Sequence, residues 1–129
     1  MSYKREIIAT HEAPGAVGPY SQGIVTDGLV FTAGQIPINP ATGTIEGESI
    51  EDQTRQVLRN VDAVLRASGS GLYNVVKMTV FMTDLGDFKA MNGVYAEFFP
   101  SDPPARSAVQ VVALPLGAQI EMEAVALAP

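Results

Sequence analysis

The sequence predicts an α+β fold in which one mixed β-sheet carries two helices on one face. The expected elements follow one another as strands, a helix, a strand, a helix and strands. The longest periodic segment has the apolar spacing of a helix, whereas the strands expected at 74–83 and 107–114 are apolar on both faces. The first of these strands is expected to place Val76, Met78, Val80 and Met82 on one face. The 129 residues are enough for one hydrophobic core, so a single domain is expected over 1–129.

The N-terminal third is predicted to be β-structure with long loops. Strands are expected at 5–10, 22–26 and 29–33. Asp27-Gly28, between the last two, is suited to a tight hairpin turn. A loop rich in glycine and proline precedes them at 14–20, and the stretch 37–48 is expected to be an exposed loop.

A long amphipathic helix is predicted to begin at Ser49, with Asp52 completing a weak capping box, and to end at Gly69. Its apolar stripe consists of Ile50, Val57, Leu58, Val61, Val64 and Leu65. Its other face alternates acids and arginines: Glu51, Arg55, Arg59, Asp62 and Arg66. Such mixed charge is typical of a solvated face and argues against a nucleic-acid patch.

A second helix is predicted to begin at an Asp87 cap and to end before Pro100. The side chains that it should bury are Phe88, Met91, Tyr95 and Phe98. The chain closes with strands at about 107–114 and 119–127, separated by the turn Pro115-Leu116-Gly117. Two helices cover only one face of the sheet, so the second apolar face should be buried against other copies of the chain, which predicts a homo-oligomer.

Composition excludes several classes of function. The chain has no cysteine, hence no disulfide, no thiolate nucleophile and no cysteine-based zinc site. His11 is the single histidine, which disfavours a Ser/His/Asp triad or a histidine metal site within one chain. The net charge of −6 argues against binding of phosphate backbones. No apolar run spans a bilayer and 1–6 opens no signal peptide, so a cytoplasmic protein is expected.

A few polar residues in apolar or tightly turned segments are candidates for chemistry. Arg106 follows Asp102-Pro103-Pro104-Ala105 and opens an apolar strand; it is either an edge arginine pointing to water or a clamp that binds a carboxylate with two parallel hydrogen bonds. Glu121 and Glu123 point to one side of the last strand. They form the wet face of an edge strand, or one of them handles protons in an interfacial cleft, where burial raises its pKa.

Two further residues are weaker candidates. Tyr20 follows Gly18-Pro19, a stiff turn that would hold a phenol in place, although such a tyrosine more often serves packing. Asn92 lies in the middle of the second helix, where asparagine has poor propensity, which hints at a role for its side chain.

The chain resembles the RidA/YjgF family over nearly its whole length. The segments that carry this resemblance are Gly18-Pro19-Tyr20-Ser21-Gln22-Gly23, Phe31-Thr32-Ala33-Gly34-Gln35-Ile36-Pro37, Val76-Lys77-Met78-Thr79-Val80-Phe81, Asn92-Gly93-Val94-Tyr95, Pro104-Ala105-Arg106-Ser107 and Ile120-Glu121-Met122-Glu123-Ala124. Each segment alone is modestly specific, but their order and spacing together are strongly so.

The resemblance implies a chorismate-mutase-like fold and a homotrimer with clefts at the subunit interfaces. It implies an imine deaminase without cofactor or metal. Such a hydrolase converts 2-aminoacrylate, or the 2-iminopropanoate and 2-iminobutanoate type of imine, to a 2-keto acid and ammonia. Arg106 matches the carboxylate-binding arginine, and Glu121 matches the glutamate that positions the attacking water. The substrate-binding positions that the resemblance implies are Tyr20, Gly34, Asn92 and Ala108.

Two positions depart from the commonest family pattern. Ala108 stands where many deaminases carry cysteine, and Ala33 where many carry serine. Both bear on substrate preference and rate, but neither removes the arginine or the glutamate. Two rival functions remain: a trimeric module that binds a small carboxylate without turnover, and an endoribonuclease or translation inhibitor, a label also attached to the family. The negative charge and the lack of a histidine pair argue against the ribonuclease.

Overall fold

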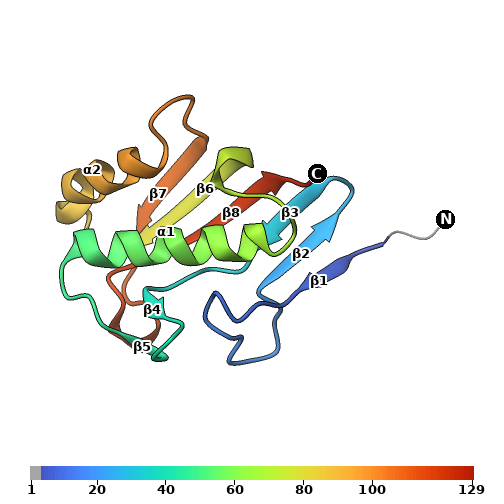
Figure 1. Ribbon diagram of the computed structural model, residues 1–129. Helices are drawn as coiled ribbons and strands as arrows, with labels where there is room; N and C mark the ends of the chain where they lie inside the picture. Colours follow the sequence, from blue (N-terminus) through green and yellow to red (C-terminus); the bar gives the residue numbers. More distant parts are fainter. Residues whose placement is uncertain (1–3) are drawn as a thin grey trace.

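The computed structural model describes residues 4–129, which form a six-stranded sheet with both helices on one face (Figure 1). The strands of this sheet are β1 (Glu6–Ile8), β2 (Gly23–Thr26), β3 (Leu29–Thr32), β6 (Val75–Met82), β7 (Ala105–Gln110) and β8 (Ile120–Leu127). Their spatial order is β1-β2-β3-β8-β6-β7. Only β6 and β7 are parallel, and the other neighbours are antiparallel. The mixed sheet predicted from the sequence is therefore confirmed.

The turn between β2 and β3 is the tight hairpin that the sequence indicated. Asp27 and Gly28 both adopt positive φ, 47° and 76°, as a two-residue turn of type I′ requires. The expected exposed loop at 37–48 is only partly a loop, because it contains a small hairpin of β4 (Ile38–Asn39) and β5 (Thr44–Ile45). Strands of two residues are too short for periodicity to reveal them.

Helix α1 (Ile50–Arg66) has the caps and the buried stripe that the sequence predicts. Ser49 Oγ accepts a hydrogen bond of 3.0 Å from the backbone N–H of Asp52. Beyond the last turn, Gly69 takes a φ of 84°, and the N–H of Ser70 donates back to the carbonyl of Leu65. The fully buried members of the stripe are Val57, Leu58, Val61, Val64 and Leu65.

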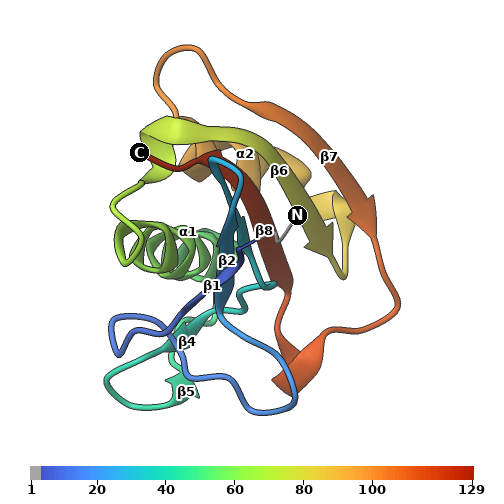
Figure 2. The same ribbon diagram turned by 90° about the vertical axis from the view of Figure 1, so that its right-hand side faces the viewer.

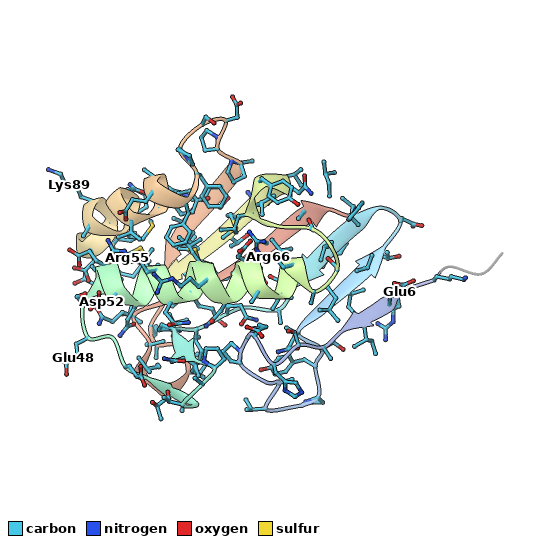
Figure 3. The ribbon with its side chains drawn as sticks, viewed as in Figure 1. Glu6, Glu48, Asp52, Arg55, Arg66 and Lys89 are labelled. Atoms are coloured by element: carbon cyan, nitrogen blue, oxygen red, sulfur yellow. The ribbon has the colours of Figure 1, made fainter. Side chains whose placement is uncertain are left out.

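On the outer face of α1, Arg55 and Arg66 are paired with acids, as expected for a solvated surface. Arg66 Nε lies 2.6 Å from Asp62 Oδ2, and Arg55 reaches Glu97 on the second helix at 3.2 Å. Figure 3 shows the labelled Arg55 and Arg66 along this helix. Because acids accompany the arginines, this face offers no continuous track for an anionic backbone.

Helix α2 (Phe88–Phe98) occupies the predicted range, but its N-terminus differs in detail. Asp87 precedes the helix without a capping hydrogen bond from its side chain. Instead Asp84 Oδ1 accepts from the N–H of Gly86 and so caps the short 3-10 turn η2 (Leu85–Asp87). The other 3-10 turns are η1 (Leu72–Asn74) and η3 (Pro115–Gly117), the second at the predicted turn before β8.

Two predictions about strands were wrong. The strand expected at 107–114 is β7, which begins at Ala105 and ends at Gln110. Its neighbour β6 ends at Met82, which pairs with Gln110, so the apolar residues that follow have no strand to pair with. The expectation that Val76 shares a face with Met78 also fails, because a register shift between Val75 and Lys77 leaves Val76 exposed.

The core lies between the helices and one face of the sheet, and Figure 2 shows both helices on this side. The four methionines of the described residues, Met78, Met82, Met91 and Met122, are all fully buried there. The opposite face of the sheet carries no helix of residues 4–129 and presents exposed apolar side chains. No helix in this range has the length and apolarity needed to cross a membrane. Residues 1–3, part of the signal-peptide prediction, lie outside the described range.

Candidate active site

Arg106 is the second residue of β7 and points to the helix side of the sheet. It pairs with Met78, whose side chain is fully buried beneath the helices. Because β7 is the edge strand, Arg106 is half-buried at the rim between β7 and α2. The simple interpretation of this residue, an edge arginine that points to water, is therefore wrong.

Helix α2 supplies the contacts of the Arg106 guanidinium. Arg106 Nη1 donates a hydrogen bond of 2.8 Å to Asn92 Oδ1. The guanidinium carbon lies 4.7 Å from the ring centroid of Tyr95 and 5.3 Å from that of Phe88. Arg106 forms no ion pair with any carboxylate of residues 4–129. The guanidinium is thus fixed in place while most of its N–H donors stay available to a ligand.

A cavity of about 440 Å³ opens beside this arginine. Its lining residues are Asn92, Tyr95, Ala96, Phe99, Pro103, Pro104 and Arg106. Burial raises the pKa of the Tyr95 phenol to about 12, although the charge of Arg106 opposes the shift. The phenol is therefore neutral at physiological pH and does not neutralise the arginine. A mostly apolar cavity with one free cation, among the described residues, suits a small anionic ligand.

Glu121 lies on β8 in the middle of the sheet, on the face opposite to the helices. Both Glu121 and Glu123 point to this open face, as the alternation predicts, but β8 is an inner strand and not an edge strand. Glu121 is half-buried and Glu123 is exposed. Burial raises the pKa of Glu121, and the negative charge of Glu123 adds to the effect. The raised pKa makes the Glu121 carboxylate a better proton acceptor than an ordinary carboxylate.

The absence of a side chain at Gly34 leaves room for the Glu121 carboxylate. The segment after β3 continues beside β8, because Gln35 exchanges two backbone hydrogen bonds with Met122, of 2.8 and 3.1 Å. This pairing sets Gly34 directly against the Glu121 carboxylate. A Cβ at position 34 would lie 2.9 Å from the carboxylate carbon of Glu121 and closer still to its Oε2. A glycine is needed for the two to approach so closely.

Tyr20 lies at the same end of the sheet as Gly34, on the loop that leads into β2. The neighbouring Gln22 is buried and fixes this loop: its side chain bonds the backbone N–H and carbonyl of Thr10 at 2.7 and 3.0 Å and the carbonyl of Pro14 at 2.8 Å. The Gln22 carbonyl also accepts from the N–H of Ala33. The Tyr20 ring itself is half-exposed, and within residues 4–129 its hydroxyl oxygen accepts only from the N–H of Val17.

Within one subunit, the predicted site residues form two separate groups. Arg106 is level with Ala124 across β6, whereas Glu121 is three residues earlier on β8. The spacing of strands and residues puts the two Cα atoms roughly 14 Å apart. Their side chains moreover point to opposite faces of the sheet. The structure joins Arg106 with Asn92, and Glu121 with Gly34, but it does not join these pairs to one another.

Ala108 and Ala33 are the two positions that depart from the commonest pattern of the RidA/YjgF family. Ala108 lies on the helix side of β7, two residues beyond Arg106, and its methyl group packs against the core. Ala33 contributes its backbone N–H to the contact with Gln22. The sequence did not single out Gln22 or Tyr95 for a role at the site. Gln22 stands between Ser21 and Gly23, where a polar residue is ordinary, so no local pattern distinguished it.

Comparisons with known proteins agree with this architecture. The family model described as "Endoribonuclease L-PSP" matches residues 10–128. The chain is 50% identical to Reactive Intermediate Deaminase A, chloroplastic, of Arabidopsis thaliana, over 97% of this chain and 67% of that protein. It is 43% identical to the human 2-iminobutanoate/2-iminopropanoate deaminase, over 95% and 90% of the two chains.

A solved structure adds a ligand to the comparison. Escherichia coli TdcF with bound serine superposes with a TM-score of 0.91 at 46% identity, over 96% of this chain and 99% of that one. Fold and sequence agree over nearly the whole of this chain. The chain therefore belongs to the Rid family, also described as the YjgF or L-PSP family, as its motifs indicated.

Proposed function

We propose that this protein hydrolyses small 2-imino acids to 2-keto acids and ammonia, in clefts completed by two subunits of a homotrimer with a chorismate-mutase-like fold. The observation that carries this proposal is Arg106, a fixed and half-buried guanidinium without a carboxylate partner in residues 4–129. The names of the Arabidopsis and human relatives support the reaction. The serine bound to the E. coli relative has the α-carboxylate that Arg106 would hold here. A cytoplasmic location is part of the proposal.

In the proposed reaction, Arg106 binds the substrate carboxylate and Glu121 handles protons. Glu121 accepts a proton from a water molecule as the water oxygen attacks the imine carbon and the C=N bond becomes a single bond. Glu121 passes this proton to the imine nitrogen, which gives a neutral carbinolamine and restores the carboxylate. Glu121 next accepts the proton of the carbinolamine hydroxyl and delivers it to the nitrogen, so that the C=O bond forms, the C–N bond breaks and ammonia leaves. Because the imine is already electrophilic, positioning and proton transfer supply the required acceleration.

Two subunits are required because Arg106 and Glu121 point to opposite faces of their own sheet. A small imino acid does not span roughly 14 Å and a sheet between them. In a cyclic trimer, however, each interface brings one surface of a subunit against a different surface of its neighbour. The open face of the sheet is apolar enough for such burial; its exposed members include Ile7, Phe31, Val109 and Leu127.

Turnover is tested with a coupled assay. A pyridoxal-phosphate serine or threonine dehydratase generates the imine, semicarbazide traps it, and the protein is expected to reduce the amount of trapped product. Glu121→Gln should abolish this reduction, whereas binding of a 2-keto acid should survive. If neither small imino acid is consumed while a carboxylate still binds through Arg106, the chain is a binding module. Ribonuclease activity that survives Arg106→Ala would not belong to this site.

The two-subunit cleft is tested by mixing inactive variants. Subunits carrying Arg106→Ala and subunits carrying Glu121→Gln are combined in equal amounts by co-expression with different tags. A cleft between neighbours would have both groups intact at about one quarter of the interfaces, so about one quarter of the wild-type activity should return. A cleft within one subunit would stay inactive in every mixture. Mixing two differently tagged Arg106→Ala chains is the control.

A further inference from the structure

One face of α2 is built around Arg106. Phe88, Asn92 and Tyr95 occupy positions i, i+4 and i+7 of the helix, so they form a single stripe. All three contact the guanidinium, Asn92 by a hydrogen bond and the two aromatic residues through their rings. Residues seven apart in a helix are separated by ~10.5 Å along its axis. With its carbon 5.3 and 4.7 Å from the two ring centroids, the guanidinium sits between the rings.

The Tyr95 side chain contacts Arg106 through its ring and not through its hydroxyl. The residue is 6% exposed, and its hydroxyl oxygen is buried without a hydrogen-bond partner in residues 4–129. Phe99 packs against the ring at 4.7 Å between centroids, which fixes its orientation. A ring face held in this way attracts a cation by its quadrupole.

We propose that Tyr95 is a positioning residue that acts through its aromatic face, holding Arg106 with the help of Phe88 and Asn92 so that a ligand carboxylate binds along the open edge of the guanidinium. The inference rests on the proposed role of Arg106 as a carboxylate clamp. The rings cover the guanidinium and Asn92 engages Nη1, whereas Nε and Nη2 have no hydrogen-bond partner in residues 4–129 and form an edge that can donate two parallel hydrogen bonds.

The physical advantage of this arrangement is preorganisation. A free arginine side chain loses much rotamer freedom when it binds a ligand, and that loss weakens binding. Here the rings and the Asn92 amide have already restricted Arg106 before the ligand arrives. Removal of the aromatic face should therefore weaken capture of the substrate and leave the proton transfer at Glu121 unaffected. The expected signature is a higher KM with a nearly unchanged kcat.

The test compares Tyr95→Leu, Tyr95→Phe and Phe98→Leu in the full-length protein. Tyr95→Leu removes the aromatic face and should raise KM roughly 2- to 30-fold, the range expected for a cation–π contact. Tyr95→Phe keeps the face and removes only the hydroxyl, so KM should return to the wild-type value. Phe98→Leu removes an aromatic ring of the same helix that packs on the core and is not one of the two rings in contact with Arg106, and it controls for loss of stability.

Two measurements make the result independent of turnover. Isothermal titration with 2-oxobutanoate, a 2-keto acid, should show the same loss of affinity in Tyr95→Leu, and no loss in Phe98→Leu. In NMR spectra of the unliganded protein, the Nε–Hε resonance of Arg106 should carry the ring-current shift of a proton near aromatic rings. This resonance is identified by its absence in Arg106→Ala, and Tyr95→Leu should move it towards the position of a free arginine.

The outcomes separate this inference from the proposed function. If the protein binds 2-oxobutanoate through Arg106 but consumes no imine, the proposed function fails. The role of Tyr95 is then supported if Tyr95→Leu weakens binding of 2-oxobutanoate, and refuted if it does not. If Tyr95→Leu leaves KM, affinity and the Arg106 resonance unchanged, the positioning role is refuted. It is also refuted if Tyr95→Phe loses as much as Tyr95→Leu, because the hydroxyl would then be the contributing group.

Discussion

Gly34→Ala should impair the proposed catalysis while leaving the fold intact. The new Cβ would lie 2.9 Å from the carboxylate carbon of Glu121, whereas non-bonded carbon atoms prefer about 3.5–4.0 Å. The carboxylate would therefore have to withdraw by about 1 Å. Displacements of this size can lower a rate by about a hundredfold, so kcat should fall by up to that factor with little change in KM. Because φ of Gly34 is not positive, alanine fits the backbone and the melting temperature should hardly change.

The imine assay described above gives kcat and KM for this variant, and calorimetry gives its stability. The matched control is the double variant Gly34→Ala with Glu121→Gln. If the methyl group acts only by displacing the Glu121 carboxylate, the double variant should bind 2-oxobutanoate with the same affinity as Glu121→Gln alone. A kcat for Gly34→Ala within about threefold of wild type would refute the reasoning. Catalysis would then not depend on the position of the Glu121 carboxylate beside Gly34.

Three further results are expected. Arg106→Ala should lower kcat/KM roughly thirtyfold or more, since truncating a buried partner in a charge pair typically costs about 2–5 kcal/mol; a loss below about threefold would rule out the clamp. Glu121→Gln should raise the melting temperature at pH 7, because burial raises the pKa of Glu121 and the ionised form destabilises the folded state. Below the ordinary carboxyl pKa of about 4.3, Glu121 is protonated in both the folded and the unfolded state, so the difference should vanish on acid titration. Gly93→Ala should stabilise α2 by about 1 kcal/mol, because a Cβ there meets no atom within 4 Å; thermal unfolding that shows destabilisation would mean that another subunit fills the space.

Much of the fold could be predicted because local patterns and tertiary contacts agree. The stripe of α1 has helical spacing, and the structure buries it. The Asp27-Gly28 turn requires two positive φ angles, and these are the residue types that tolerate them. The end of β7 could not be predicted in this way. The apolar run continues after Gln110, but β6 ends, and pairing partners are not visible in the pattern of a single segment.

The candidate site could be predicted as a set of residues but not as an arrangement. Alternation within β8 correctly put Glu121 and Glu123 on one face. This alternation does not say whether the two glutamates point to the same face of the sheet as Arg106 on β7. The register of both strands on β6 decides this relation: Arg106 shares a row with Met78, and Glu121 shares a row with Phe81. Alternate residues of β6 point to opposite faces, so the two groups are separated within one chain.

The burial of every described methionine, together with an alanine and not a cysteine at position 108, should make the protein resistant to oxidation. Thiols and exposed thioethers are the side chains that peroxide modifies most readily. The sequence contains no thiol, and the thioethers of Met78, Met82, Met91 and Met122 are fully buried in the core. The proposed chemistry uses a guanidinium and a carboxylate, neither of which is redox-active. Peroxide at concentrations that inactivate thiol-dependent enzymes should therefore leave its activity intact, so that the protein would keep working under oxidative stress.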